Sequence, residues 1–468
     1  MIPIHAYAGR RVGVLGLGRS GLATARALKA GGAEPVCWDD DAAARETAAL
    51  EGLEMADLTR EREAATLACL VVSPGIPQLY PAPHPAVVWA RAAGVAVDND
   101  VGLFFAEFLS REAEDEPEPK IVAVTGSNGK STTTALIHHI LKAAGRRTQI
   151  GGNIGRGVLD LEMPEAGEVA VLELSSYQIE LARTLAPDIA VFLNLSPDHL
   201  ERHGGIGGYF AAKRRLFELG SPARSVIGID EPEGRQLASI TAGVTGAPIT
   251  VSVTTRLRGK GWSVFMHKNH LTEWRRGKQI AAFDLRPAPA LRGVHNHQNA
   301  CAAYAACRAV GLAPRQIEGG LLSFPGLAHR MERVGEAAGI VFVNDSKATN
   351  ADAAEQALLA YDHIRWIAGG RPKAGGIEPL RPLFGKIAKA YLIGEAEADF
   401  AATLGATPHA RCGTLAAAVA AARAEARPGD VILLSPACAS FDQFASFEAR
   451  GEAFRALVAP SLAEEAGR

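Results

Sequence analysis

One short segment contains the residue types and spacing best suited to binding a reactive ligand: Gly126-Ser127-Asn128-Gly129-Lys130-Ser131-Thr132. An apolar run before it (residues 121–124) predicts a buried strand, and the hydrophobic pattern after it predicts a helix. Backbone N–H groups at such a turn, with the positive end of a helix behind them, bind phosphate. The Lys130 ammonium would reach the outer phosphates of a nucleotide, and the Ser131 hydroxyl would ligate Mg²⁺. The segment therefore predicts a site for a nucleoside triphosphate.

This loop is shorter than the general phosphate-loop pattern, in which four residues separate the first glycine from the Gly-Lys pair. Only Ser127 and Asn128 stand between the glycines here. The alternative is a plain strand-to-helix turn with a solvated lysine. The combination of a strand, two glycines, a lysine and adjacent hydroxyls favours the phosphate site.

A second glycine-rich turn, Gly16-Leu17-Gly18-Arg19-Ser20-Gly21, follows an apolar run near the N-terminus and precedes a helix predicted over residues 22–29. Asp39 ends the next predicted strand, and Ser73-Pro74-Gly75 ends another. Because ligands of parallel sheets bind at the carboxyl ends of the strands, these turns predict a site for a diphosphate or nucleotide group, with NAD less favoured. The alternative is a tight turn that only lets the helix pack on its strand.

Polar side chains also follow two predicted strands near the phosphate loop. Glu173 opens the segment Glu173-Leu174-Ser175-Ser176, and His199 ends the segment Asn194-Leu195-Ser196-Pro197-Asp198-His199. Phosphoryl transfer needs metal ligands close to the triphosphate, and oxygen or imidazole groups at strand ends can serve. Each residue alone fits a structural role, but their shared placement predicts a metal site. Lys213, taken alone, has the pattern of a surface lysine.

The elements that must position these residues alternate between strand and helix along the whole chain, which predicts parallel sheets with crossover helices. In the first section, further strands are predicted at 35–38, 70–73 and 95–97. In the second they are predicted at 168–173, 188–194, 225–230 and 249–253, and in the third at 340–343, 364–368, 391–393 and 431–434.

The chain is long enough for about three domains. An acidic, proline-containing stretch at 111–120 predicts a linker, and residues 323–326 predict a second boundary. We therefore expect an α/β protein of three domains: an N-terminal Rossmann-like domain over 1–112, a central phosphate-loop ATPase-like domain with a parallel sheet over 113–322, and a C-terminal Rossmann-like domain over 323–468.

Composition narrows the class of function. A net charge of −2 gives no overall attraction to nucleic acid or to an anionic membrane. The N-terminus lacks the basic-then-apolar order of a secretory signal, and no apolar stretch approaches the roughly 20 residues that span a bilayer. The six cysteines are scattered without a Cys-x-x-Cys pair, which argues against a disulfide framework or a zinc site. We expect a cytoplasmic monomer.

Taken in order along the chain, the motifs resemble the Mur ligases of bacterial cell-wall synthesis. Besides 126–132 and 173–176, the resemblance rests on Gly151-Gly152-Asn153-Ile154-Gly155, His295-Asn296-His297-Gln298-Asn299, His329-Arg330, Asn344-Asp345-Ser346-Lys347-Ala348-Thr349-Asn350 and Ser435-Pro436-Ala437-Cys438-Ala439-Ser440-Phe441-Asp442. Within the family, these motifs are most similar to those of the member that adds D-glutamate to UDP-N-acetylmuramoyl-L-alanine.

The resemblance implies an ATP- and Mg²⁺-dependent amide ligase whose three domains bind, in order, the UDP group, ATP and the amino acid. The substrate carboxylate would take the γ-phosphoryl group, and the glutamate amine would attack the acyl phosphate. That route is chemically sensible, because a carboxylate is a poor acyl donor whereas an acyl phosphate has a good leaving group. The protein must then position the reactants and neutralise charge.

The resemblance also assigns roles by position. It implies that Lys130, Glu173, His199 and Lys213 are catalytic, with Ser131, Glu173, His199 and a carbamate on Lys213 as metal ligands. The implied ATP contacts are Gly126, Ser127, Asn128, Gly129, Lys130, Ser131, Thr132, Asn296, Asn299, Arg330 and Asp345. The implied contacts to the UDP-linked substrate are Gly18, Arg19, Ser20, Asp39, Ser73, Pro74, Gly75, Asn153 and Ser175, and those to the amino acid are Lys347, Thr349, Lys373, Ser440 and Phe447.

Two segments depart from the family pattern. Asp39-Asp40-Asp41 stands where relatives often carry Asp-Thr-Arg beside the uracil ring, and the loop at 369–376 is less acidic than the loops of relatives. The rival functions are a ligase of the same architecture for L-glutamate or another acidic amino acid, a nucleotide-sensing module without catalysis, and a nicotinamide dehydrogenase. The dehydrogenase would rest on the turn at 16–21 alone, whereas three separate ligand-type constellations argue against a simple sensor.

Overall fold

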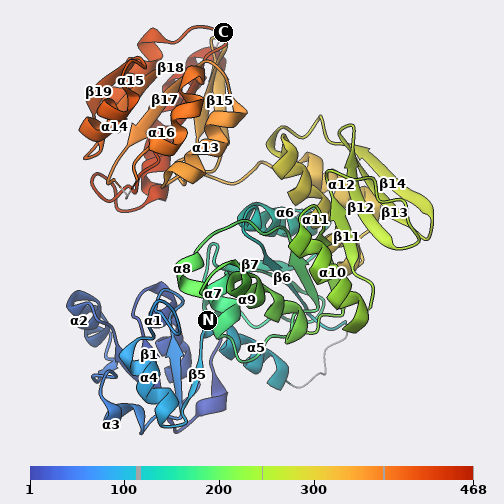
Figure 1. Cartoon of the computed structure of the whole chain (residues 1–468), viewed down its shortest axis with the longest axis vertical. Helices are drawn as coiled ribbons and strands as arrows, with labels where there is room; N and C mark the ends of the chain where they lie inside the picture. Colours follow the sequence, from blue (N-terminus) through green and yellow to red (C-terminus); the bar gives the residue numbers. More distant parts are fainter. Residues whose placement is uncertain (112–116, 245, 373–374, 467–468) are drawn as a thin grey trace. The chain divides into compact units, whose positions relative to one another are not determined.

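The computed structural model describes residues 1–111, 117–244, 246–372 and 375–466 (Figure 1). Contacts divide the chain into two compact units, Met1–Phe324 and Pro325–Arg468. Within the described residues, the first unit contains two sheets and the second contains one. The predicted α/β class with parallel-rich sheets is confirmed. The predicted domain limits stay a prediction. Residue 112, at the first predicted limit, lies outside the described residues, as do residues 113–116 of the expected linker.

The first sheet has five parallel strands in the described part of the chain, in the order β3-β2-β1-β4-β5. Its strands read as short, continuous apolar runs because helices cover the sheet (Figure 1). The strands are β1 (Arg11–Leu15), β2 (Glu34–Trp38), β3 (Glu54–Met55), β4 (Cys69–Val72) and β5 (Ala96–Asp98). The helices are η1 (His5–Tyr7), α1 (Arg19–Ala30), α2 (Ala42–Leu50), α3 (Glu61–Ala64), α4 (Pro85–Ala92) and α5 (Asp100–Ser110).

The second sheet has nine strands among the described residues, in the order β14-β13-β12-β11-β10-β9-β6-β8-β7. Only the β12–β13 and β13–β14 pairs are antiparallel. The strands are β6 (Lys120–Thr125), β7 (Thr148–Gly152), β8 (Val169–Glu173), β9 (Ile189–Phe192), β10 (Arg224–Gly228), β11 (Ile249–Ser252), β12 (Trp262–His267), β13 (His270–Arg275) and β14 (Lys278–Asp284). The helices are α6 (Lys130–Ala143), η2 (Val158–Asp160), α7 (Ser176–Leu181), α8 (Leu200–His203), α9 (Ile206–Glu218), α10 (Pro232–Val244), η3 (Pro289–Leu291), α11 (Val294–Val310) and α12 (Pro314–Leu322).

The second unit contains one mixed sheet, which has six strands in the described residues and the order β15-β16-β20-β17-β18-β19. β15 runs antiparallel to β16, and the other pairs are parallel. The strands are β15 (Glu332–Ala337), β16 (Ile340–Asn344), β17 (Ile364–Gly369), β18 (Ile387–Ile393), β19 (His409–Gly413) and β20 (Val431–Leu434). The helices are α13 (Ala351–Ala360), η4 (Glu378–Lys386), α14 (Glu397–Leu404), α15 (Leu415–Glu425) and α16 (Phe447–Ala466).

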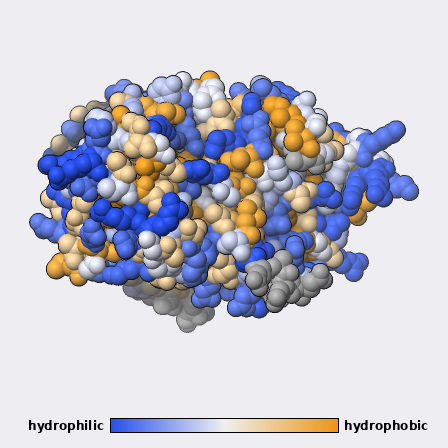
Figure 2. Space-filling model, turned by 90° about the horizontal axis from the view of Figure 1, so that it is seen from below, coloured by the Kyte–Doolittle hydropathy of each residue, from blue (hydrophilic) through white to orange (hydrophobic). Residues whose placement is uncertain are grey.

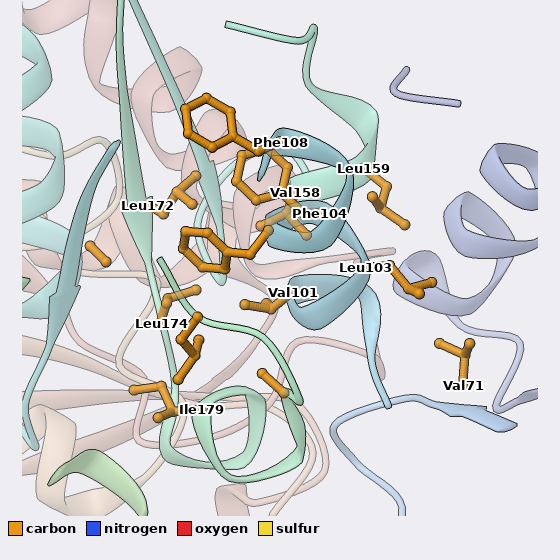
Figure 3. Close-up of a cluster of buried hydrophobic side chains, with 14 of the residues drawn as sticks. Val71, Val101, Leu103, Phe104, Phe108, Val158, Leu159, Leu172, Leu174 and Ile179 are labelled. Carbon is orange, nitrogen blue, oxygen red and sulfur yellow. The ribbon is translucent and has the colours of Figure 1, made fainter. Parts of the chain in front are cut away.

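A large apolar cluster joins the first two sheets. It contains Val101, Phe104 and Phe108 of α5 together with Leu172 of β8 (Figure 3). The Phe104 and Phe108 rings stack with their centroids 6.2 Å apart. Because burial of apolar surface is the main favourable term in packing, α5 is the element that ties the first sheet to the second.

The face in Figure 2 carries hydrophobic side chains interspersed with hydrophilic ones. Among the described residues, no helix is long and apolar enough to cross a bilayer.

Candidate functional site

The phosphate loop connects β6 to α6 at the carboxyl end of a central strand of the second sheet. Gly126 and Gly129 have φ values of +151° and +83°, a region that favours glycine. A Cβ atom at Gly129 would lie only 2.1 Å from Oδ1 of Asn299 on α11. No side chain caps the first turn of α6, which begins at Lys130. The loop therefore presents the start of a helix in the way that anion sites do.

Polar side chains after β9 and on α11 fix the loop in place. Asn194 Oδ1 accepts a hydrogen bond from the Asn128 N–H at 2.9 Å, and the Ser127 hydroxyl donates to the Ser196 carbonyl at 3.0 Å. Asn194 Nδ2 also donates to Gln298 Oε1 at 2.7 Å. The sequence prediction gave Asn194, Ser196 and Gln298 no role, although it quoted the motifs that contain them. The sequence signal was present, but only the fold shows that these side chains meet.

Asn296 and Asn299, the predicted nucleotide contacts on α11, lie beside the same loop. The Thr133 hydroxyl donates to Asn299 Oδ1 at 3.2 Å, and Asn299 Nδ2 donates to Asn296 Oδ1 at 3.2 Å. Thr133 is one turn into α6, so this chain of amides runs along the start of the helix. The structure thus brings together the two halves of the predicted nucleotide site that lie more than 160 residues apart in sequence.

Two lysine ammonium groups converge on the loop. Lys130 Nζ donates to the carbonyls of Gly126 at 3.0 Å and Ser127 at 2.8 Å. Lys213 Nζ, from α9, donates to the same Gly126 carbonyl at 2.8 Å and lies 4.5 Å from the centroid of the Tyr209 ring. Lys213 is only 1% exposed. The interpretation of Lys213 as a surface lysine is therefore wrong, because α9 turns this side chain toward the phosphate loop.

The surroundings of Lys213 favour its neutral amine. Burial lowers the pKa of Lys213 well below its usual value, and the nearby Lys130 charge lowers it further, whereas Asp198 and Glu173 raise it. Burial is the larger cause because an ammonium removed from water loses hydration that a carbonyl and an aromatic ring only partly replace. Burial also raises the pKa of the neighbouring Tyr209 to about 12, so that residue remains a phenol at neutral pH.

Glu173 ends β8 and is buried. Its Oε1 atom accepts from Asn153 Nδ2 at 2.9 Å, whereas its Oε2 atom is buried without a hydrogen-bond partner among the described residues. A buried carboxylate oxygen without a partner is costly, and a divalent cation beside the phosphate loop would fit it. The Ser175 hydroxyl, two residues on, caps α7 through Gln178. Ser175 therefore has a structural role besides its predicted one.

His199 lies at the start of α8 in the left-handed backbone region, with φ +52°. Its Nε2 atom is 3.5 Å from Asp198 Oδ2, its ring centroid is 5.1 Å from that of Tyr177, and its side chain is 48% exposed. Across the described ranges, no group of three or more His, Cys, Asp and Glu side chains could hold a metal ion. Ligation of Mg²⁺ by Ser131, Glu173, His199 and modified Lys213 therefore stays a prediction.

A cavity of about 380 Å³ opens at the carboxyl ends of the first sheet. The predicted residues Gly18, Arg19, Ser20, Asp39, Ser73 and Pro74 line it, together with Leu15, Gly16, Asp40, Ile76 and His84. Gly75, the remaining predicted residue of this sheet, does not line the cavity, and its carbonyl accepts from Arg202 Nη1 of α8 at 2.9 Å. The helix above the cavity begins at Arg19, three residues before its predicted start.

Asp39 and Asp40, in the acidic run beside this cavity, have different hydrogen-bond partners. The Asp39 carboxylate accepts from the N–H groups of Leu17 at 2.6 Å and Asp41 at 2.9 Å, so it shapes the glycine-rich turn. His84 Nδ1 accepts from the Ala86 N–H, which leaves Nε2–H to donate to Asp40 at 3.2 Å. The sequence prediction missed His84, which no glycine or strand pattern marked.

In the second unit, Asp345 is the central buried carboxyl group. It accepts from the Ser435 hydroxyl at 2.8 Å and from the Met331 N–H at 3.1 Å. Burial raises the pKa of Asp345 to about 7, although these hydrogen bonds and the charge of Arg330 lower it. Arg330 and Asp345, both predicted ATP contacts, therefore lie close enough for their charges to interact.

The described residues predicted to bind the amino acid lie in or next to two loops of the second unit, residues 345–350 and 435–446. Lys347 Nζ lies 5.8 Å from the centroid of the Phe447 ring, Ser440 is buried, and Thr349 is half-buried before α13. The fully buried Arg450 donates to the carbonyls of Ser346, Cys438 and Ala439, which joins the two loops. Lys373 lies outside the described residues.

Comparisons with known proteins agree with this architecture. The model of the Mur ligase middle domain matches residues 124–307, and that of the Mur ligase glutamate ligase domain matches residues 329–438. The chain is 62% identical over 461 residues to a UDP-N-acetylmuramoylalanine–D-glutamate ligase of Cereibacter sphaeroides, covering 98% of this chain and 99% of that one. It is 59% identical to the ligase of the same name from Dinoroseobacter shibae, covering 99% and 100%.

A solved structure shows the same fold at low identity. The UDP-N-acetylmuramate–alanine ligase of Thermotoga maritima matches with a TM-score of 0.57 and 18% identity, over 97% of this chain and 99% of that one. The two sheets of the first unit, the separate third sheet and the full-length similarity to curated relatives lead to one conclusion. The chain belongs to the Mur ligase family and is a ligase.

Proposed function

We propose that this chain joins the amine of D-glutamate to the carboxylate of UDP-N-acetylmuramoyl-L-alanine, with cleavage of ATP to ADP and phosphate, as a step of peptidoglycan synthesis. The observation that carries the proposal is the 57–62% identity, over nearly the whole chain, to relatives that are named for these substrates. The phosphate loop with its two lysines and the cavity of the first sheet supply sites of the required chemistry.

The chemistry follows in two steps. A carboxylate oxygen of the UDP-linked substrate attacks the γ-phosphorus, the bond to the ADP oxygen breaks, and an acyl phosphate forms. The glutamate amine then attacks the acyl carbon, the C–O bond to phosphate breaks, and the amine releases a proton. Lys130 neutralises charge on the transferring group, and the loop N–H groups orient it.

Glu173, His199 and Ser131 would hold Mg²⁺, which supplies charge neutralisation between the triphosphate and the attacking carboxylate. We further propose that the Lys213 amine adds to CO₂ and releases a proton to form a carbamate, which would be an anionic ligand for Mg²⁺. The reaction requires a neutral amine, and the buried position of Lys213 supplies one.

In the second unit, Lys347, Thr349, Ser440 and Phe447 would contact the glutamate. A cationic Lys347 suits an acidic amino acid, and Arg330 and Asp345 would meet ATP. Assignment to the cytoplasm, action as a monomer and the preference for D- over L-glutamate remain part of this proposal.

The test is an assay of the purified full chain with ATP, Mg²⁺, UDP-N-acetylmuramoyl-L-alanine and D-glutamate, read as phosphate release and product mass. Formation of the D-glutamyl product, with little turnover of L-glutamate, is the expected result. Equal turnover of both glutamates would overturn the stereochemical assignment. ATP cleavage without any amide product would favour a nucleotide-sensing module instead.

A further inference from the structure

The turn from β5 to α5 (residues 98–102) makes buried polar contacts that the reaction described above does not use. Asn99 is fully buried, and its Oδ1 atom accepts from the Gly102 N–H at 2.9 Å, which caps α5. Its Nδ2 atom donates to the carbonyl of Gln178 on α7 at 2.8 Å. The neighbouring Asp98 carboxylate accepts from the N–H of Arg183, just after α7, at 3.0 Å. The turn therefore makes hydrogen bonds to α7 near the middle of the helix and just beyond its end.

These contacts with α7 also constrain the residues that precede the helix. The side chain of Gln178, whose carbonyl Asn99 holds, accepts from both the N–H and the hydroxyl of Ser175 at 3.1 Å. Ser175 follows Glu173, the buried carboxylate near Lys213. A path of hydrogen bonds therefore runs from the turn at 98–102, through Gln178, to Ser175, two residues after Glu173.

The other end of the same turn reaches the cavity of the first sheet. Asp100, next to Asn99, is buried and lies close to Ser20, which lines that cavity. The packing of α5 supports the path, because Val101 belongs to the same buried apolar cluster as Leu174, just after β8, and Ile179 of α7 (Figure 3). Gly102 is needed here, since a Cβ atom would lie 1.9 Å from Asp98 Oδ1.

We infer that Asn99 is a positioning residue that sets the distance between the nucleotide cavity of the first sheet and the phosphate-loop site. The inference rests on the proposed function, in which one substrate has its UDP end in the cavity and its carboxylate end at the phosphate loop. A ligand with two attachment points gains affinity only when the points stand at the right separation. UDP alone occupies one point and gains nothing from that separation.

Asn99→Ser provides a selective test, because Ser caps helices as well as Asn does. The variant keeps an acceptor for the Gly102 N–H but cannot reach the Gln178 carbonyl, and it adds no charge between the buried Asp98 and Asp100. We expect the Kd of UDP-N-acetylmuramoyl-L-alanine, measured by calorimetry, to rise about tenfold or more, while the Kd of UDP changes less than about twofold. The KM of ATP should stay near its wild-type value, whereas kcat should fall.

Two comparisons separate positioning from simple loss of stability. Thr414→Ala removes the cap of α15 in the second unit, where Thr414 accepts from the Ala417 N–H at 3.3 Å. It should lower Tm without changing the ratio of the two Kd values. Asn99→Thr, which also keeps a capping oxygen but cannot reach Gln178, serves if Asn99→Ser does not fold.

An unchanged ratio of Kd values in a folded Asn99 variant would overturn the inference. Equal weakening of UDP and of the whole substrate would overturn it too, because Asn99 would then act on the cavity itself. Failure of the wild-type chain to bind UDP-N-acetylmuramoyl-L-alanine more tightly than UDP would instead overturn the proposed function.

Discussion

At the scale of single residues, two lysine side chains meet at one carbonyl. Lys130 and Lys213 come from different helices, and both donate to the oxygen of Gly126. Their proximity lowers the pKa of Lys213 beyond the effect of burial. The two lysines therefore do different work: Lys130 suits charge neutralisation, and Lys213 suits chemistry that needs an uncharged amine.

Replacing Lys130 with alanine tests the first of these roles. We expect kcat to fall by a factor of about 100 or more, because one preorganised contact to developing charge is typically worth roughly 3 kcal/mol. The measurement is steady-state phosphate release, with circular dichroism to check the fold. Lys142→Ala, an exposed lysine near the end of the same helix, should keep full activity. Near wild-type turnover by Lys130→Ala would refute the phosphate-loop assignment.

Replacing Lys213 with alanine tests the carbamate. The variant should be almost inactive, and a small carboxylate such as acetate at high concentration should partly restore turnover by occupying the vacated ligand position. Arg214→Ala is the matched control, because Arg214 pairs with Glu218 at the surface of the same helix. Full activity of Lys213→Ala without added carboxylate would rule the carbamate out.

At the scale of elements, the strand β6 and the helix α6 position the phosphate loop between them. The phosphate loop closes against α11, and the fit leaves no room for a side chain at Gly129. The stretch from Trp262 to Asp284 behaves differently. It forms the antiparallel strands β12–β14 at the sheet edge, which the sequence prediction missed because charged and polar residues interrupt the apolar pattern there.

Gly129→Ala and Gly145→Ala form a matched pair, because the two glycines flank the same helix, α6. Both residues have positive φ, +83° and +76°, so each substitution costs on the order of 1 kcal/mol of stability. A Cβ at Gly145 would meet nothing within 4 Å, whereas one at Gly129 would displace Asn299. We expect Gly129→Ala to raise the KM of ATP strongly and Gly145→Ala to leave it unchanged. Equal effects of the two substitutions on this KM would show that Asn299 is not part of the nucleotide site.

At the scale of the whole molecule, the predicted site residues are divided between two compact units. The phosphate loop and the cavity of the first sheet belong to the first unit, and the buried carboxyl group of Asp345 belongs to the second. That carboxyl group makes the stability of the second unit depend on pH. Its folded-state pKa of about 7 lies above the usual value of 3.8, so the folded chain binds a proton that the unfolded chain has lost between these pH values.

The stabilising effect of protonated Asp345 is therefore fully present below pH 3.8 and is lost as the pH rises to about 7. Asp345→Asn removes this titration. Between pH 4 and 7, the free energy of unfolding of the variant should improve relative to wild type by on the order of 1 kcal/mol per pH unit at most, and the difference should level off above pH 7. Urea denaturation of the full chain at several pH values measures it. A difference that does not vary with pH would mean that Asp345 is ionised throughout.

Local patterns in the sequence determined much of this protein. Apolar runs and glycine-rich turns marked β1, β6 and most other strands, because the period and length of such runs depend only on neighbouring residues. The same patterns located the phosphate loop and most of the residues that line the cavity of the first sheet. The family resemblance extended the prediction to Asn296, Asn299 and Asp345, which the structure places in polar, buried or half-buried positions.

The tertiary structure alone decided which distant residues meet. Asn194 with Gln298, Lys213 with Gly126, and Asn99 with Gln178 are pairs separated by about 80 to 100 residues. No local pattern encodes these pairs, since strand order and helix packing follow from the burial of apolar surface across the whole sheet. The burial of Lys213 shows the difference: its sequence neighbours are arginines typical of a surface, and only the packing of α9 against the phosphate loop removes it from water.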